Sequence, residues 1–189
     1  MLSRELLLRT FQAGLEYPAY VNTGTPGQQA AWRRMESQVK LAPAQQALVE
    51  GFTREMPVLV VSGIWCGDCA QQCPLLACIA AASRRIRLRF VDRDEQREFA
   101  SHLRINAGDR VPVAVFMAED HELVAMYGDK TLSRYRALAA RELGPSCPLP
   151  GAAVADQEAQ NALQDWLNEF ERVQLLLRLS GRLRARHGD

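Results

Sequence analysis

The sequence has no long apolar run and no excess of charge of either sign. Its 189 residues carry 23 Lys and Arg against 22 Asp and Glu, a formal net charge of +1. Such a balance does not favour nucleic acid or a charged membrane surface as a partner. No stretch approaches the roughly 18 consecutive apolar residues that a membrane-spanning helix needs. We therefore expect neither nucleic acid nor a membrane as a partner.

The N-terminal segment lacks the apolar core of a secretory signal, because charged residues flank the short run Leu6–Leu8. We therefore expect a cytoplasmic protein, in a compartment that keeps thiols reduced. No glycine-rich phosphate loop and no Ser/His/Asp signature occurs. His102 and His121 stand in no metal-binding spacing, and we expect both at the surface.

Cysteine is present in an odd number, and most of it is clustered. Cys66, Cys69, Cys73 and Cys78 lie in one short segment, and Cys147 stands apart in a proline-rich loop. A disulfide framework would be even-numbered and spread along the chain. In a reducing compartment, such a cluster indicates redox chemistry or metal binding.

Apolar periodicity divides the chain into three parts. Residues 1–56 are expected to form an N-terminal helical extension, residues 57–144 an α/β core, and residues 145–189 a linker followed by a C-terminal helix. The helices expected in the first part are Glu5–Leu15, Gln28–Leu41 and a third from Pro43 to about Gly51. The strands expected in the second part are Val58–Val61, Ile86–Phe90, Pro112–Met117 and Leu123–Tyr127, the last two as a hairpin, and its helices are Cys69–Ser83, Gln96–Leu103 and Thr131–Leu143.

A long helix is expected over Ala153–Leu179, beyond a loop over residues 144–151 that prolines exclude from helix. One face of this helix is apolar, which favours packing on the core over a contact with a second copy of the chain. The arginine-rich tail that follows is expected to be frayed and solvated. The residues of the apolar face are Leu163, Trp166, Leu167, Phe170, Val173 and Leu177.

The segment from Ser62 to Cys69 joins the first expected strand to a helix. A cysteine at a helix start faces unpaired N–H groups and the positive end of the helix dipole, which favour the thiolate. A second cysteine about one turn further can reach the first sulfur and expel a mixed-disulfide partner. We therefore interpret Cys66 as the nucleophile and Cys69 as the resolving thiol, with Gly67 keeping the turn between them open.

Four further features surround this motif, and together they resemble thioredoxin over about Phe52–Leu143. The resemblance implies a thioredoxin fold, an α/β architecture with a central mixed sheet flanked by helices, here with an N-terminal helical extension and a long C-terminal helix. The four features are Trp65 directly before Cys66, Pro74 five residues after Cys69, Pro112 just before a strand, and Gly128 after the last strand.

A narrower resemblance is to a bacterial branch of thioredoxin-like proteins with a WCxDC site. It rests on Trp65–Cys69, on Asp92–Asp94 and on the segment 103–108 before Val111. Members of this branch tend to carry added N-terminal helices. The resemblance implies an activity class and no particular substrate.

The resemblance also implies roles for residues outside the two cysteines. In the family, the proline that corresponds to Pro112 follows a cis peptide bond. The residue before that proline offers its backbone to an extended substrate. Val111 and Pro112 would hold these roles, and Gly128 would let a partner approach the same surface. Trp65 and Asp68 would complete the catalytic segment.

The chain departs from the family at several positions. Asp68 replaces a proline, and its carboxylate is expected to raise the pKa of Cys66, although it also suits the first turn of a helix. Val60 and Leu88 occupy the positions of a buried aspartate and of the lysine that pairs with it. The usual proton acceptor of the resolving thiol is therefore missing, and Asp68 or water is left to take that proton.

The remaining cysteines allow two interpretations each. Cys73 lies one helical turn beyond Cys69, as a small buried residue or as a third exchanging thiol. Cys78 is expected in the core. Cys147 is expected to be exposed, as an incidental or a regulatory thiol.

Three functions follow from these residues. The first is a thiol–disulfide oxidoreductase that needs no cofactor or metal, acts on a disulfide-containing protein or small molecule, and is restored by a recycling reductase. The second is a protein that binds zinc or an iron–sulfur cluster through Cys66, Cys69 and Cys73. The third is a non-catalytic adaptor on a thioredoxin scaffold, which acts or forms a homodimer through its C-terminal helix.

Overall fold

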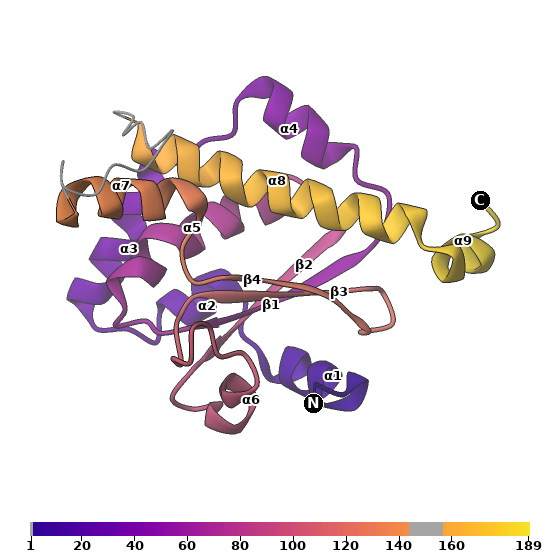
Figure 1. The fold of residues 1–189 in the computed structure, drawn as a ribbon, viewed down its shortest axis with the longest axis horizontal. Helices are drawn as coiled ribbons and strands as arrows, with labels where there is room; N and C mark the ends of the chain where they lie inside the picture. The colour runs from indigo at the N-terminus through magenta and orange to yellow at the C-terminus, as the bar shows by residue number, and fades with distance from the viewer. Residues whose placement is uncertain (1, 144–156) are drawn as a thin grey trace.

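A four-stranded mixed sheet lies at the centre of the described part of the chain (Figure 1). The computed structural model describes residues 2–143 and 157–189. The strands stand in the order β2-β1-β3-β4, with β1 parallel to β2 and β3 antiparallel to both β1 and β4. This arrangement confirms the expected mixed sheet and the expected hairpin. The strands are β1 (Met56–Ser62), β2 (Ile86–Asp92), β3 (Val113–Met117) and β4 (Leu123–Gly128).

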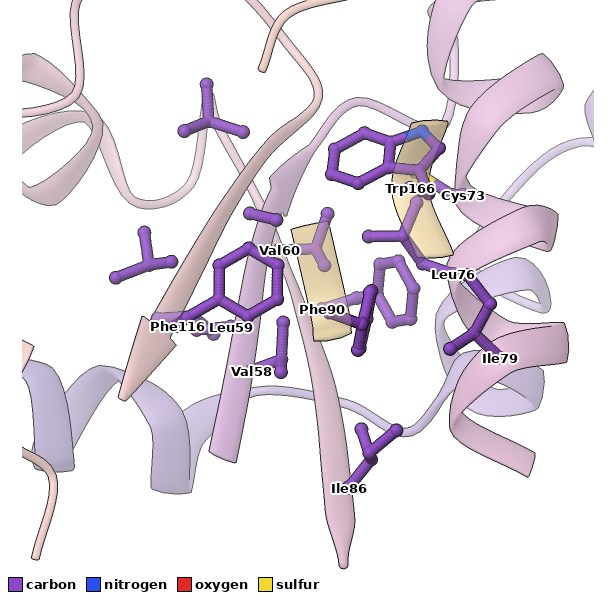
Figure 2. Packing of buried hydrophobic residues seen from close by; sticks show 14 of the residues in the cluster. Val58, Leu59, Val60, Cys73, Leu76, Ile79, Ile86, Phe90, Phe116 and Trp166 are labelled. Carbon is purple, nitrogen blue, oxygen red and sulfur yellow. The ribbon is translucent and has the colours of Figure 1, made fainter. Parts of the chain in front are cut away.

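Strand β1 is buried along its whole length, as its apolar sequence predicts for a central strand. Val60 pairs with Phe90 on one side and with Ala114 on the other. Its side chain lies in the apolar cluster of Figure 2, together with Leu76 of the helix after β1 and Trp166 of the C-terminal part. The position at which the resemblance places an aspartate is therefore an ordinary core position here.

Helices cover both faces of the sheet. Figure 1 shows α5 (Gly67–Ala81), α7 (Leu132–Glu142) and α8 (Glu158–Leu179) on one side, and α1 (Arg4–Ala13) and α6 (Arg97–Ser101) on the other. Helix α8 contacts α5, α7 and β4, and α3 (Pro26–Gln38) contacts α5. None of the helices in the described part of the chain is both long and apolar enough to cross a membrane.

The N-terminal helices differ from expectation at three points. Helix α1 ends at Ala13, because Leu15 leaves the helix to form a backbone bridge with Phe90 of β2. A short helix that the apolar pattern did not predict, α2 (Tyr17–Val21), follows and buries Tyr20. Helix α3 begins earlier than expected, where Thr25 forms a capping box with Gln28. The last helix of this part, α4 (Pro43–Glu50), is as expected.

The C-terminal helix packs on the core, as its apolar face predicts. The six residues of that face are all buried within the chain. The tail is not frayed: α9 (Gly181–His187) begins at the capping residue Ser180. Its Arg186 and His187 pair with Glu119 in the β3–β4 turn, so the positive charges of the tail meet carboxylates from the hairpin. Cys147 and the loop around it lie outside the described residues.

Candidate active site

The first cysteine of the motif stands at the start of α5. Cys66 is the capping residue with an extended backbone, and its carbonyl accepts the first helical hydrogen bond, from Ala70 N–H at 3.0 Å. The helix therefore begins at Gly67, two residues before the expected start. An added Cβ at Gly67 would meet nothing within 4 Å in the described residues. Space alone therefore does not require glycine at this position, and a role of Gly67 in keeping the turn open stays a prediction.

The two cysteines of the motif differ in exposure. Cys66 is half-buried, whereas Cys69 is fully buried one turn further. The Cys66 thiol faces the backbone carbonyl of Val111, with 3.9 Å between Sγ and O. The Gly63 N–H donates to the Cys69 sulfur at 3.5 Å. Both cysteines are free thiols in the structure.

The helix start does not by itself make Cys66 acidic. Its hydrogen bond with Cys69, followed by its partial burial, raises the pKa of the Cys66 thiol. The backbone N–H groups of Asp68 and Cys69 act in the opposite direction, as expected at a helix N-terminus, but they are outweighed. Burial also raises the pKa of the Cys69 thiol well above its ordinary value. The neighbouring sulfur and partial burial therefore oppose the thiolate that a helix start favours at Cys66.

The loop that contains Val111 and Pro112, here called the proline loop, lies directly against Cys66. The Val111–Pro112 peptide is cis, as the resemblance implies, and both residues are buried. Gly128 pairs with Val113 at the start of β3, and an added Cβ at Gly128 would lie 2.4 Å from the Pro112 carbonyl oxygen. Glycine is required here, because any side chain would overlap backbone. The structure thus brings Val111, Pro112 and Gly128 together beside Cys66.

Asp68 points to two cations rather than to the cysteines. Its carboxylate lies 2.8 Å from Lys130 Nζ and 3.2 Å from Arg134 Nη2. Arg134 also pairs with Glu158 at the start of α8. The groups that raise the pKa of Cys66 are Cys69 and burial, not the Asp68 carboxylate. The expectation that Asp68 raises that pKa is therefore not supported, since its charge is used in a network that ties α5 to α7 and α8.

A second set of polar residues, around the Asp129 carboxylate, holds the proline loop in place. The carboxylate of Asp129 is almost fully buried and accepts hydrogen bonds from Tyr135 Oη at 2.5 Å and from Arg110 Nη1 at 3.2 Å. These partners lower the pKa of Asp129 despite the opposing effect of its burial. Because Arg110 directly precedes Val111, the pair holds the proline loop against the end of β4.

Trp65 is exposed beside Cys66, as a substrate-facing residue would be. Nearly half of its surface, 48%, is accessible. The Arg93 guanidinium lies over its ring at 4.6 Å, and Arg93 Nη1 also donates to the Asp109 carbonyl at 3.0 Å. The indole is thereby held in one orientation between the nucleophile and the loop that leads to Pro112.

The N-terminal helices contribute to this site directly. Trp32 of α3 is fully buried, and its indole N–H donates to the Ile64 carbonyl in the loop before Cys66 at 3.2 Å. Tyr20 of α2 is buried and stacks on the Phe90 ring of β2, with 5.4 Å between the ring centroids. No sequence pattern gave a role to these residues, nor to Arg93, Arg110, Asp129, Lys130 and Arg134. The local sequence signal that could have drawn attention to this group is the pair of charged residues directly after Gly128, Asp129 and Lys130.

The other candidate residues lie elsewhere. Cys73 is fully buried, with its sulfur 3.5 Å from Ser62 Oγ. Cys78 is half-buried rather than central in the core, and lines a cavity of about 590 Å³ at the far end of α5. His102 is exposed, whereas His121 is partly buried against the Phe11 ring at 5.5 Å. In the two described ranges, no group of three or more His, Cys, Asp or Glu side chains has the geometry of a metal site.

Comparison with known proteins places this geometry in a family. Of the solved structures, a protein of unknown function from Pseudomonas aeruginosa is similar, with 20% identity, a TM-score of 0.66, and coverage of 92% of this chain and 97% of that one. An HIV epitope-scaffold is also similar, with 16% identity, a TM-score of 0.67, and coverage of 88% and 95%. These likenesses concern the fold alone. No curated protein matches the sequence. The model of a thioredoxin family matches residues 14–133, more than half of the chain, and the chain therefore belongs to the thioredoxin family.

Proposed function

We propose that this protein is a thiol–disulfide oxidoreductase, in which Cys66 is the nucleophile and Cys69 the resolving thiol. The observation that carries the proposal is the position of the Cys66 sulfur. It is half-exposed at the start of α5, faces the carbonyl that precedes the cis proline, and lies one helical turn from the buried thiol of Cys69. The Trp-Cys-Gly-Asp-Cys order supports membership of the thioredoxin-like branch with a WCxDC site.

The reaction takes place between sulfur atoms alone. The Cys66 thiolate attacks a substrate disulfide, a bond forms between Cys66 and one substrate sulfur, and the other leaves as a thiolate that takes up a proton. Cys69 then attacks Cys66, the Cys66–Cys69 disulfide forms, and the second substrate thiol is released. The substrate is reduced by two electrons, and an external dithiol or reductase restores the pair. A family-like potential of about −270 mV favours this reducing direction in the cytoplasm.

The groups around Cys66 suit an extended disulfide-containing segment. The buried backbone of Val111 is turned toward the thiol, and Gly128 leaves room where a side chain would overlap Pro112. Trp65 offers an exposed aromatic surface beside the reacting sulfur. We infer that these residues hold the substrate, chiefly through its backbone.

Reduction of insulin disulfides tests the proposal. The wild-type protein, supplied with dithiothreitol, is expected to accelerate reduction well above the rate of dithiothreitol alone. Cys66→Ser should abolish the acceleration, and Cys69→Ser should leave a trapped mixed disulfide on Cys66 that mass spectrometry detects. Cys78→Ser, at the far end of the same helix, is the matched control and should retain full activity. Activity that survives in Cys66→Ser would refute the assignment.

A further inference from the structure

One buried carboxylate, that of Asp129, lies between α7 and the proline loop. Its side chain is only 2% exposed, although burying an ionised group is costly unless it is paired. Tyr135 Oη of α7 and Arg110 Nη1 donate to its two oxygens, at 2.5 and 3.2 Å, and Lys130 Nζ lies 3.4 Å away. Donors from α7 and from the proline loop therefore compensate the charge of this one carboxylate.

The backbone of the same residue is held by α5. Gln72 of this helix has no exposed surface, and its Nε2 donates to the Asp129 carbonyl at 2.9 Å. Gln72 Oε1 is buried and has no hydrogen-bond partner within residues 2–143 and 157–189. An apolar side chain at this core position would avoid the cost of that orphaned oxygen. The contact that accounts for a glutamine here is therefore its bond to Asp129.

Asp129 thereby connects the two parts of the site. Gln72 belongs to α5, whose capping residue is the nucleophile Cys66. Arg110 directly precedes Val111, whose carbonyl oxygen lies 3.9 Å from the Cys66 sulfur. A buried, hydrogen-bonded charge of this kind adds little net stability compared with apolar packing, but it has few alternative arrangements. The position of the substrate-facing backbone relative to the thiol therefore depends on Asp129.

We propose that Asp129 is a positioning residue for the substrate, which holds the proline loop at its distance from the Cys66 thiol through Arg110 and Gln72. The inference rests on the proposed function and deepens it, since it concerns how a disulfide-containing polypeptide is held. Asp129 touches no reacting atom, and exchange between Cys66 and Cys69 proceeds without it. Its loss therefore weakens the binding of a substrate that uses the backbone of the proline loop, and leaves the reactivity of the thiol unchanged.

Insulin reduction and alkylation of the same protein separate these two effects. Asp129→Asn keeps the size of the side chain and removes its charge. Its KM for insulin, with dithiothreitol as reductant, is expected to rise about tenfold, with kcat within about twofold of wild type. Tyr135→Phe removes one oxygen from a half-exposed ring and should raise KM about threefold. Iodoacetamide needs no contact with the proline loop, so its rate of reaction with Cys66, followed by mass spectrometry, should stay at the wild-type value in both variants.

Two buried glutamines provide a matched comparison. Gln72→Met removes the hydrogen bond to the Asp129 carbonyl. Gln174→Met removes hydrogen bonds to the backbone of Thr53 and Arg54, which precede the start of β1 rather than follow its end. Both substitutions remove a buried amide of the same size, so both should lower the free energy of unfolding in urea. Only Gln72→Met should raise the KM for insulin.

The outcomes distinguish a positioning role from a merely structural one. If Asp129→Asn does not fold, Tyr135→Phe and Gln72→Met decide, because neither disturbs a charge. A wild-type KM in the folded variants, or an equal rise of KM in Gln174→Met, would overturn the inference. Alkylation of Cys66 that slows in parallel with insulin reduction would overturn it as well. A wild-type protein that does not accelerate insulin reduction would instead refute the proposed function, and the inference with it.

Discussion

Gly128→Ala is the substitution with the most clearly calculable cost at this site. The added Cβ would lie 2.4 Å from the Pro112 carbonyl oxygen and 3.1 Å from Val113 Cα. The first distance is about 1 Å short of the 3.4 Å at which contact becomes ordinary. Both atoms belong to the backbone of the proline loop and β3, so neither can rotate away. The clash can be relieved only if the end of β4 moves away from the proline loop.

The size of the effect follows from that constraint. Overpacking against rigid structure costs about 1–3 kcal/mol in the free energy of unfolding. For a protein of this length, a loss of about 2 kcal/mol lowers Tm by roughly 4–8 °C. Activity should fall further than stability alone explains, because the displaced loop carries the carbonyl that faces Cys66.

Urea denaturation and insulin reduction, measured on the same preparations, test this prediction. Gly67→Ala is the matched control, since its added Cβ meets no described atom within 4 Å and alanine favours helix over glycine by roughly 0.5–1 kcal/mol. The control should be as stable as wild type or slightly more so. If Gly128→Ala unfolds at the same urea concentration as Gly67→Ala, the steric argument is wrong.

Three further predictions follow from burial and charge. Asp68→Asn should lower the free energy of unfolding by about 1 kcal/mol, because Lys130 and Arg134 each lose one of their two carboxylate partners. It should leave the pH profile of Cys66 alkylation unchanged, and a profile moved to lower pH would show that the carboxylate does act on the thiol. Trp166→Ala should cost about 3–5 kcal/mol in urea denaturation, since the indole is fully buried between the C-terminal helix and the core; a cost under 1 kcal/mol would mean that α8 is only loosely attached. Because burial raises the pKa of Cys69, the folded state keeps this proton above about pH 8.5 while the unfolded chain loses it, so stability should fall with rising pH by up to about 1.4 kcal/mol per pH unit. Cys69→Ala should reduce that slope, and an equal slope in the variant would contradict the assignment.

The sequence alone predicted much of this protein. The apolar run at β1, the alternation at β2 and the expected hairpin define the sheet, because local periodicity reports which faces are buried. The spacing of Cys66 and Cys69 places both thiols at one helix start, because two residues three apart directly after a strand both fall in the first turn of the helix that follows. The apolar face of α8 predicted its packing on the core for the same reason.

Tertiary structure alone decided the polar groups that surround the thiols. Lys130 and Arg134 pair with Asp68 from more than 60 residues away, and the Trp32 indole of α3 donates to the Ile64 carbonyl just before Cys66. Side-chain hydrogen bonds and ion pairs depend on positions in space, and no periodicity along the chain records them. The direction in which the pKa of Cys66 moves was likewise decided by tertiary structure. Burial and the neighbouring sulfur raise this pKa, and they outweigh the helix N-terminus that the sequence predicts.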